Sequence, residues 1–334
     1  MNKSTVPVGT GNFVRNVIET NRRRNVDFDV VSNPEFLREG SAIQDTLHPD
    51  RIVIGAPNQI VAMKILELYA PLERPMIITD VASAEMIKYA SNAFLAMKIS
   101  FANAVANICD EVEADITQVV KGMGLDHRIG HAFLNAGLGY GGSCFPKDSS
   151  SLLHTARSVG YEFPLLAATI ETNDLQPQRF INRMEKALGG FNGKKVAVLG
   201  LAFKANTDDM RDAKSLDVIK ALTEGGATVV AYDPIAIENA KKYFPNITYA
   251  KNAFEAAEGA DAVVVVTEWN EFKQINLDKL RATMSGNILC DGRNIYDPAK
   301  VTRSGFNYVG IGRGSSGMNA ATDTKNVDVA PKGG

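Results

Sequence analysis

The sequence predicts an α/β protein with two parallel-sheet regions joined by helices. Short apolar runs rich in valine and isoleucine alternate with longer amphipathic segments, which is the pattern of β-α-β units. The chain has 334 residues, of which 45% are hydrophobic, so it is long enough for two domains with substantial cores. With 36 basic and 38 acidic residues, it offers no basic surface for nucleic acid.

The first region, residues 1–78, is expected to be the C-terminal half of a parallel-sheet domain. Residues 4–9 have the composition of a loop that leaves a strand, yet no strand precedes them. The elements expected after this loop are a helix over 10–21, strands over 28–32, 51–55 and 75–78, and a helix over 59–69. We therefore expect the first half of this sheet to be missing from the chain.

A long helical pattern runs from Asp80 to about Lys121. Its apolar stripe includes Phe94, Phe101 and Ile108, seven residues apart, and no glycine or proline interrupts it. At ~1.5 Å per residue such a helix would be roughly 60 Å long, which is more than one domain covers. Two interpretations are open, a kinked pair of helices and a connecting helix that packs against a partner subunit, and we favour the second. This central helical region is expected over 79–188, with further helices over 147–159 and 165–188.

The C-terminal region is predicted to be a second Rossmann-like domain over residues 189–313. The glycine-rich stretch 189–193 marks its start. The expected elements are strands over 195–200, 228–233, 262–266 and 287–291 and a helix over 215–225. Residues 314–334 are small and polar without a periodic pattern, so we expect a disordered tail.

Several classes of protein do not fit the composition. No apolar run approaches the ~18 residues of a membrane span, and the N-terminus lacks the hydrophobic stretch of a signal peptide. Three cysteines cannot form a disulfide framework, which indicates reduced thiols and a cytoplasmic setting. Four histidines, and three cysteines without a CxxC pair, argue against a bound metal, and we expect none.

Residues 137–142 match the dinucleotide-binding pattern GxGxxG literally. We reject this function for them, because no strand leads into the segment and residues 143–146 do not open a helix aimed at a pyrophosphate. Glycines here would instead let the backbone approach another group closely.

Cys144 follows this segment and is a candidate nucleophile. Lys147 and Asp148 open the next predicted helix, and both a helix N-terminus and a nearby ammonium favour a thiolate. The alternative is a small buried hydrophobic residue, which is the interpretation that fits Cys109 and Cys290.

Two further pairs have a spacing of four residues. Lys88 and Asn92 share one face of the long helix among apolar neighbours, so they could point into a cleft rather than into solvent. Glu35 and Glu39 follow a predicted strand, where open α/β sheets bind their ligands, although a surface turn is the simpler interpretation of each.

Six motifs then occur in one order. They are Ser-Thr-Val-Pro-Val-Gly at 4–9, Asn-Pro-Glu-Phe-Leu-Arg-Glu-Gly at 33–40, Lys88 with Asn92, Gly-Gly-Ser-Cys-Phe-Pro-Lys-Asp at 141–148, Gly-Leu-Ala-Phe-Lys at 200–204 and Asp-Gly-Arg-Asn at 291–294. Over about residues 2–313 this order resembles the UDP-glucose/GDP-mannose dehydrogenase family.

The resemblance implies a four-electron oxidation of UDP-glucose at C6, with two molecules of NAD. It makes Cys144 the nucleophile, which would form a thiohemiacetal and then a thioester with the sugar carbon. Lys88 and Asn92 would stabilise the oxyanion, and Asp148 would act with Lys88 and a water molecule as base.

The resemblance also assigns supporting roles. Glu35 would be the acid/base of thioester formation and hydrolysis and would contact the substrate, while Thr5 would position water. The expected cofactor contacts are Thr5, Glu39, Lys147 and Arg211.

For the sugar nucleotide, the resemblance implies a wrapping loop over residues 133–142 and contacts from the C-terminal domain. The residues concerned are Phe133, Leu134, Asn135, Gly141, Phe203, Lys204 and Arg293. Arg128 matches an arginine that enters the neighbouring subunit's site, which implies a homodimer.

One departure and several alternatives remain. The family begins with a strand, a GxGxxG turn and an acidic residue for the adenosine ribose, all ahead of its counterpart of residues 4–9, so we expect this chain to bind NAD weakly or not at all and not to turn over. The substrate could instead be GDP-mannose or a UDP-N-acetylhexosamine. A non-catalytic nucleotide-sugar-binding dimer and a hydroxyacid dehydrogenase with an inert Cys144 are the other hypotheses.

Overall fold

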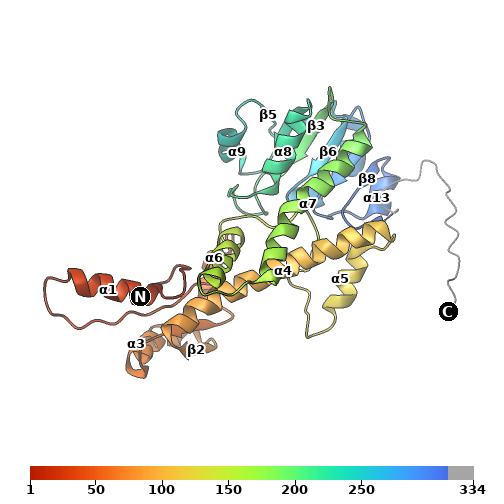
Figure 1. Ribbon diagram of the computed structural model, residues 1–334. Coiled ribbons are helices and arrows are strands. Elements are labelled where there is room, and N and C mark those ends of the chain that lie inside the picture. Colours follow the sequence, from red (N-terminus) through yellow and green to blue (C-terminus); the bar gives the residue numbers. More distant parts are fainter. Residues whose placement is uncertain (315–334) are drawn as a thin grey trace, which may run out of the picture.

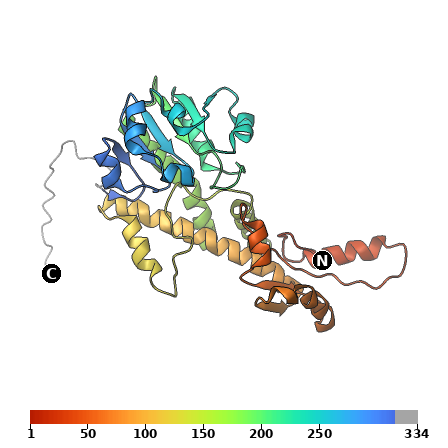
Figure 2. The same ribbon diagram turned by 180° about the vertical axis from the view of Figure 1, so that it is seen from behind.

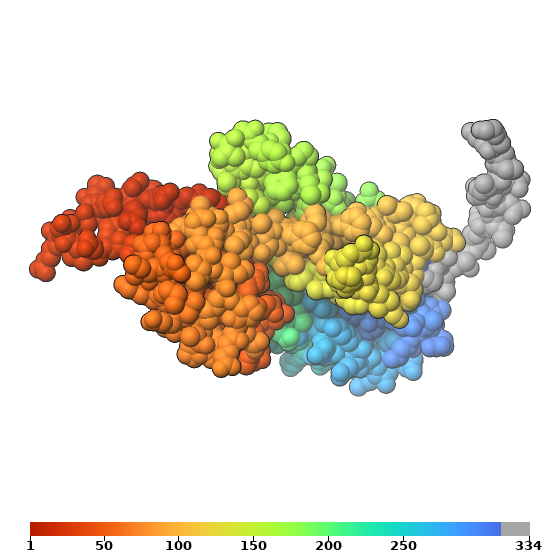
Figure 3. Space-filling model, turned by 90° about the horizontal axis from the view of Figure 1, so that it is seen from below, coloured from red at the N-terminus to blue at the C-terminus, as the bar shows by residue number. Residues whose placement is uncertain are grey.

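The computed structural model describes residues 1–314 and contains two parallel sheets at opposite ends of a long helix, α4 (Val81–Glu111). The predicted α/β architecture is confirmed. Figure 3 shows the N-terminal elements at one end of the molecule and the C-terminal domain at the other, with α4 between them. Within the described residues, every helix is too short or too polar to cross a membrane.

The N-terminal elements are α1 (Thr10–Asn21), α2 (Ala42–Leu47), β1 (Ile52–Gly55), α3 (Gln59–Tyr69), the short η1 (Ala70–Leu72) and β2 (Met76–Thr79). They include the two predicted helices and two of the three predicted strands, whereas α2 and η1 were not predicted. β1 and β2 pair in parallel with Ile52 opposite Met76, and Ile54 packs against α3 residues such as Val61. Figure 2 shows α1 standing apart from the other N-terminal elements, and its Phe13 is 67% exposed.

The strand predicted over 28–32 is not formed. Ser32 makes only isolated bridges, in parallel with Asn2 and antiparallel with Gly55. A strand needs a continuous ladder of hydrogen bonds. Here Asn2 pairs with the chain around Ser32 for a single step, through Asn2 N to Val31 O at 2.7 Å and Asn33 N to Asn2 O at 2.8 Å. Residues 25–29 therefore lack a partner strand within the described chain.

The single helix predicted from Asp80 to Lys121 is also wrong, and the kinked-pair interpretation is the correct one. α4 ends at Glu111, Glu113 takes a left-handed φ of 59°, and α5 (Ile116–Gly124) follows. The side chain of Asp115 caps α5 by accepting a hydrogen bond from Thr117 N at 2.8 Å. α4 alone has 31 residues, or roughly 46 Å at ~1.5 Å per residue.

Two helices lie along α4 and connect it to the C-terminal domain. α6 (Phe145–Ser158) begins two residues earlier than predicted, and α7 (Pro164–Leu188) then runs into that domain (Figure 1). The end of α7 packs against the second sheet through Phe180 and Met184. α6 and α7 thus fix the site-bearing part of α4 relative to the C-terminal domain.

The C-terminal domain is a six-stranded parallel sheet in the order β5-β4-β3-β6-β7-β8. Its strands are β3 (Lys195–Leu199), β4 (Thr228–Tyr232), β5 (Thr248–Tyr249), β6 (Ala262–Val265), β7 (Ile288–Asp291) and β8 (Asn307–Val309), and its helices are α8 (Lys214–Glu224), α9 (Ile237–Tyr243), α10 (Ala253–Ala257), α11 (Asn270–Lys273), α12 (Leu277–Thr283) and α13 (Pro298–Arg303). Alternate residues of β3 face opposite cores: Val196 and Val198 meet α7 and α8, while Ala197 and Leu199 meet α10 and α12. The four predicted strands are present, and β5, β8 and the short helices α9 to α13 were not predicted. The predicted tail lies outside the described residues, apart from Gly314.

Candidate active site

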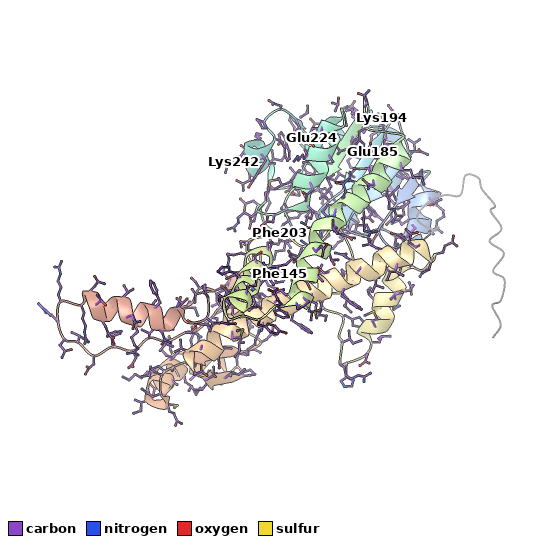
Figure 4. The ribbon with its side chains drawn as sticks, in the orientation of Figure 1. Phe145, Glu185, Lys194, Phe203, Glu224 and Lys242 are labelled. Atoms are coloured by element: carbon purple, nitrogen blue, oxygen red, sulfur yellow. The ribbon has the colours of Figure 1, made fainter. Side chains whose placement is uncertain are left out.

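A cavity of about 650 Å³ lies where the N-terminal elements, α4, the start of α6 and the C-terminal domain meet. Its walls contain most of the residues that the sequence singled out. Among the lining residues are Glu35, Glu39, Lys88, Asn92, Phe133, Gly141, Gly142, Cys144, Phe203 and Lys204. Figure 4 labels Phe145 and Phe203, which both line this cavity.

Cys144 is the N-cap residue of α6 and is exposed at the cavity. Pro146 lies in the first turn of α6, where its missing N–H removes no helical hydrogen bond and its fixed φ favours the start of a helix. The Sγ atom lies 3.6 Å from Ser143 Oγ. The other two cysteines are buried, and burial raises the pKa of Cys290 to about 12. Cys144 is therefore the accessible thiol within the described chain.

Lys88 and Asn92 point into the cavity from α4, as their spacing predicted. Both are almost fully buried, with 4% and 6% of their surface exposed. Lys88 Nζ lies 3.9 Å from Glu35 Oε1 and 5.0 Å from the centre of the Phe36 ring. A buried ammonium of this kind is held by a carboxylate on one side and an aromatic face on the other.

Asn92 is oriented by Asp148. Its Nδ2 donates to Asp148 Oδ2 at 2.6 Å, and the other carboxylate oxygen of Asp148 pairs with Lys147. Burial lowers the pKa of Lys147, but the hydrogen bond and the negative charge of Asp148, with smaller effects of Tyr89 and Cys144, together outweigh it, and the net shift is upward. Asp148 itself is fully buried. The start of α6 thus supplies both the thiol of Cys144 and the Asp148 carboxylate, which orients the amide of Asn92.

Glu39 joins the N-terminal elements to the C-terminal domain. Its carboxylate accepts hydrogen bonds from Ser143 Oγ at 3.2 Å and from Thr207 Oγ1 at 3.3 Å, and it lies 3.5 Å from Arg211 Nη2. The adjacent Gly40 has a φ of 83°, and a Cβ atom on it would lie 2.7 Å from a backbone oxygen of the C-terminal domain. The segment therefore closes one side of the cavity by close backbone contact.

Residues 137–142, which we call the glycine segment, form another part of the wall. No strand leads into the segment, as predicted, but a helix does begin at Phe145, which corrects the expectation for residues 143–146. A Cβ on Gly141 would lie 2.2 Å from Asp212 O, and one on Gly142 would lie 2.7 Å from the Phe203 ring. Glycine is required at both positions because other groups already fill the space of a side chain.

Lys204 is half-buried beside Phe203, with its Nζ 5.4 Å from the ring centre. Burial lowers the pKa of Lys204, and nearby Glu39 partly opposes this shift. A partly desolvated cation on a cavity wall gains most from an anionic ligand, because its own solvation has already been reduced.

Several predicted residues lie outside this cavity. Leu134, Asn135 and Arg293 line a second cavity of about 480 Å³ beside α5. The Arg293 guanidinium donates to three backbone carbonyls, those of Val266 at 2.6 Å, Gly139 at 3.1 Å and Phe203 at 3.1 Å. Arg293 thus ties the glycine segment to the C-terminal domain.

Arg128 and Thr5 are also outside it. Arg128 is exposed on the loop after α5 and pairs with Asp126 at 3.0 Å. Thr5 is not among the residues that line either cavity. Its loop is tied to α4 by Glu85, whose carboxylate accepts the N–H groups of Gly9 at 2.8 Å and Gly11 at 2.9 Å.

The sequence did not identify some of the lining residues. Phe36, Arg38, Asp45 and Arg51 all face the cavity, and the Arg51 guanidinium lies 3.7 Å from the centre of the Phe36 ring. Phe36 and Arg38 lie inside the motif at 33–40, so that motif was the available signal, whereas Asp45 and Arg51 belong to no pattern. The structure presents no group of three or more His, Cys, Asp or Glu side chains suited to a metal ion within residues 1–314.

Comparison with known proteins divides the chain into three matching parts. Residues 1–73 match the NAD binding domain of the UDP-glucose/GDP-mannose dehydrogenase family, residues 82–175 its central domain and residues 197–298 its UDP binding domain. The first match confirms NAD as the expected cofactor.

Individual relatives agree with this division. The chain is 48% identical over 314 residues to the UDP-glucose 6-dehydrogenase TuaD of Bacillus subtilis, an alignment that covers 94% of this chain and 68% of that protein. Among solved structures, a UDP-glucose dehydrogenase from Pyrobaculum islandicum aligns with a TM-score of 0.83 at 39% identity, covering 90% of this chain and 68% of that one. A UDP-D-ManNAc dehydrogenase from Pyrococcus horikoshii aligns with a TM-score of 0.80 at 28% identity, covering 93% and 72%.

The N-terminal wall of the cavity suits a polar group such as the nicotinamide amide. Lys3, Asn33 and Glu39 have hydrogen-bonding side chains and line this wall. A pyrophosphate usually binds the free N–H groups at the start of a helix. At the start of α1, the N–H groups of Gly9 and Gly11 are already bound to the Glu85 carboxylate, so these two donors are not available to a pyrophosphate.

Proposed function

Because the chain belongs to the UDP-glucose/GDP-mannose dehydrogenase family, we propose that its cavity oxidises UDP-glucose at C6 to UDP-glucuronate by cysteine-dependent chemistry. The observation that carries the proposal is the exposed thiol of Cys144 in the same cavity as the buried side chains of Lys88 and Asn92. NAD, when bound, supplies the hydride acceptor. Its contacts in this chain would be Thr5, Glu39, Lys147 and Arg211.

Cys144 explains how one site performs two oxidations. Addition of the thiol to the C6 aldehyde gives a thiohemiacetal, which carries a hydrogen on carbon and can release a hydride and a proton to become a thioester. Water then cleaves the thioester, which yields the carboxylate and restores the thiol. The position of Cys144 at the N-terminus of α6 supports this role, because that end of a helix favours negative charge.

The groups around the thiol would manage charge and protons. Lys88 would stabilise the alkoxide or oxyanion at C6, and Asn92, held by Asp148, would donate a hydrogen bond to the same oxygen. Asp148 and Lys88 would act with a water molecule as base in the first oxidation. Glu35, which lies 3.9 Å from Lys88, would transfer the proton during thioester formation and hydrolysis, with water positioned by Thr5.

The sugar nucleotide would extend from Cys144 towards the C-terminal domain. Phe133, Gly141, Phe203 and Lys204 line the cavity that holds Cys144, so they would contact glucose and phosphate. Leu134, Asn135 and Arg293 line the second cavity, which would receive the remainder of the nucleotide. The lowered pKa of Lys204 supports an anionic ligand at that position.

We also assign a homodimer and a reducing compartment to this function. Phe94, Phe101 and Ile108 remain 58%, 53% and 60% exposed along one side of α4, an apolar surface that a second copy would cover. Arg128 is exposed and could reach the neighbouring site. All three cysteines are free, which suits the cytoplasm.

The test uses the thiol itself. Iodoacetamide should alkylate Cys144 selectively, because Cys109 and Cys290 are buried, and UDP-glucose should slow this reaction in a saturable way. NADH absorbance with UDP-glucose and NAD measures turnover, and Cys144→Ser should abolish any turnover. The proposal would be refuted if UDP-glucose at millimolar concentration left the alkylation rate unchanged, or if Cys144→Ser retained turnover.

A second function, nucleotide-sugar binding without catalysis, is favoured by one observation. At the start of α1, the N–H groups of Gly9 and Gly11 are bound to Glu85 rather than free for a pyrophosphate, whereas Phe203 and Lys204 line the cavity on the sugar-nucleotide side. This function predicts protection by UDP-glucose without NADH formation. The same protection assay with a UDP-N-acetylhexosamine and with GDP-mannose compares the alternative substrates.

A further inference from the structure

Three amide side chains are buried against the glycine segment. Asn103 lies on α4, and Asn173 and Gln176 lie one turn apart on α7, with exposures of 0%, 3% and 1%. Burying an amide is costly unless its hydrogen bonds are made. All three bind the backbone of residues 137–140, and the oxygen of Gln176 also accepts a hydrogen bond from Asn107 Nδ2 at 2.9 Å.

The three amides form hydrogen bonds with the backbone N–H and C=O groups of Gly137 and of Tyr140. Asn103 Oδ1 accepts from Gly137 N at 2.8 Å, and Gln176 Nε2 donates to Gly137 O at 3.1 Å. Asn173 Oδ1 accepts from Tyr140 N at 2.7 Å, and its Nδ2 donates to Tyr140 O at 3.2 Å. These side chains thus replace the neighbouring strand that an extended segment would otherwise need.

The opposite side of the segment is bound by the C-terminal domain. Leu138 N donates to Gly292 O at 3.0 Å, and Gly142 N donates to Arg211 O at 2.8 Å. Arg293 donates to a further carbonyl of the segment, that of Gly139. A glycine-rich stretch that would be mobile alone is therefore fixed between the helices and the domain that forms the far wall of the cavity.

Two details indicate that the amides are specific to this segment. Gly139 has a φ of 110°, and a Cβ on it would lie 2.6 Å from Asn173 Oδ1, so the amide occupies the space that glycine leaves. Asn103 Nδ2 has no hydrogen-bond partner among the protein groups of residues 1–314. The oxygen bound to Gly137 is thus the polar contact that offsets burial of this side chain.

We infer that Asn103, Asn173 and Gln176 are positioning residues that hold the glycine segment in the shape that accepts the sugar nucleotide. The segment ends at Gly142, two residues before Cys144, so its path also sets where the thiol meets the ligand. The ligand part of this inference rests on the proposed function. The fixing of the segment does not, because it follows from the hydrogen bonds alone.

The test compares Asn173→Ala with Asn182→Ala, an exposed asparagine on the same helix, in the full chain. Hydrogen exchange followed by mass spectrometry reports the peptide over residues 133–143. We expect its exchange to accelerate at least about tenfold in Asn173→Ala, which corresponds to ~1.4 kcal/mol, the scale of the lost hydrogen bonds. Exchange in β3 and α8 should stay at the wild-type rate, and Asn182→Ala should match the wild type throughout.

The second readout is ligand protection of Cys144. The UDP-glucose concentration that halves the alkylation rate should rise about tenfold in Asn173→Ala and stay unchanged in Asn182→Ala. Faster exchange with wild-type protection would leave the amide a merely structural role and overturn the inference. Unchanged exchange would overturn it as well.

Two outcomes have separate meanings. If Asn173→Ala does not fold, as judged by circular dichroism, Asn103→Ala removes only the acceptor of Gly137 N and is held to the same criteria. If UDP-glucose fails to protect the wild type, the proposed substrate is wrong. The exchange rates of Asn173→Ala then decide alone whether the amides hold the segment.

Discussion

Asp233 offers the sharpest test of how the C-terminal domain holds its part of the site. It follows β4, is 1% exposed, and its carboxylate accepts five hydrogen bonds. Oδ1 accepts the N–H groups of Ile235 and Ala236, each at 2.9 Å. Oδ2 accepts Leu201 N at 2.8 Å, Ala202 N at 3.3 Å and the indole nitrogen of Trp269 at 3.0 Å. Leu201 and Ala202 lead directly to Phe203 and Lys204.

We expect Asp233→Asn to lower the free energy of unfolding by about 3–5 kcal/mol. An asparagine has one acceptor oxygen, so at least two of the five donors would face an NH₂ group and lose their partner. Each such loss costs about 1.5–2.5 kcal/mol, since hydrogen bonds to charged groups are stronger than the ~1 kcal/mol of neutral ones.

Urea denaturation followed by circular dichroism measures this change, with the exposed Asp278→Asn as control. The control should stay within ~0.5 kcal/mol of the wild type. A loss below ~1 kcal/mol for Asp233→Asn would refute the reasoning, because it would mean that the carboxylate contributes no more than an ordinary surface group.

Three further outcomes follow from the site and the surface of α4. Gly142→Ala should weaken the protection of Cys144 by UDP-glucose at least about tenfold, and protection equal to the wild type would contradict this. The added Cβ would lie 2.7 Å from the Phe203 ring, and a residue with a side chain loses ~1–2 kcal/mol at the φ of 80° that Gly142 adopts. Burial lowers the pKa of Lys204, and a bound phosphate anion would raise it again. Lys204 should therefore take up a proton when UDP-glucose binds at alkaline pH. The affinity for UDP-glucose should fall as the pH rises through the lowered pKa of Lys204. Calorimetry in two buffers of different ionisation enthalpy measures this uptake, and an equal uptake in Lys204→Arg would show that Lys204 is not its source. Phe101→Glu should convert a dimer to monomers in sedimentation velocity, whereas Lys121→Glu, on the neighbouring helix, should not; a monomeric wild type would remove the dimer proposal.

The elements that the sequence predicted well are those with a strong local pattern. α1, α3 and α7 and the buried strands of the second sheet have clear periodicity, so their cores could be anticipated. The break between α4 and α5 could not, because Val112 and Ile116 continue the apolar stripe and the turn uses a left-handed Glu113 rather than a glycine. The strand expected over 28–32 failed for a different reason: apolar residues predict burial, but a strand also needs a partner.

In the candidate site, too, residues in short sequence motifs could be predicted, whereas residues that act through contacts distant in sequence could not. Cys144, Lys88 and Asn92 could be predicted because they lie in short motifs. The amides of Asn103 and Gln176 could not, because their partner, Gly137, lies 34 and 39 residues away in sequence. A polar side chain inside a helix usually marks the solvent side, and only the folded chain shows that these amides face a glycine backbone.

α4 carries Asn92 and Asn103 eleven residues apart, which at ~100° per residue is almost three complete turns. One part of this helix therefore presents the Asn92 amide to the cavity that contains the thiol, while another part supports the glycine segment through Asn103, and both side chains project in nearly the same direction. Deleting one residue between Asn92 and Asn103 would rotate one of these side chains by ~100° about the helix axis relative to the other, even though the helix itself stayed intact. Any viable change in the length of this stretch must come in whole turns of the helix, so the spacing is as much a property of the site as the side chains.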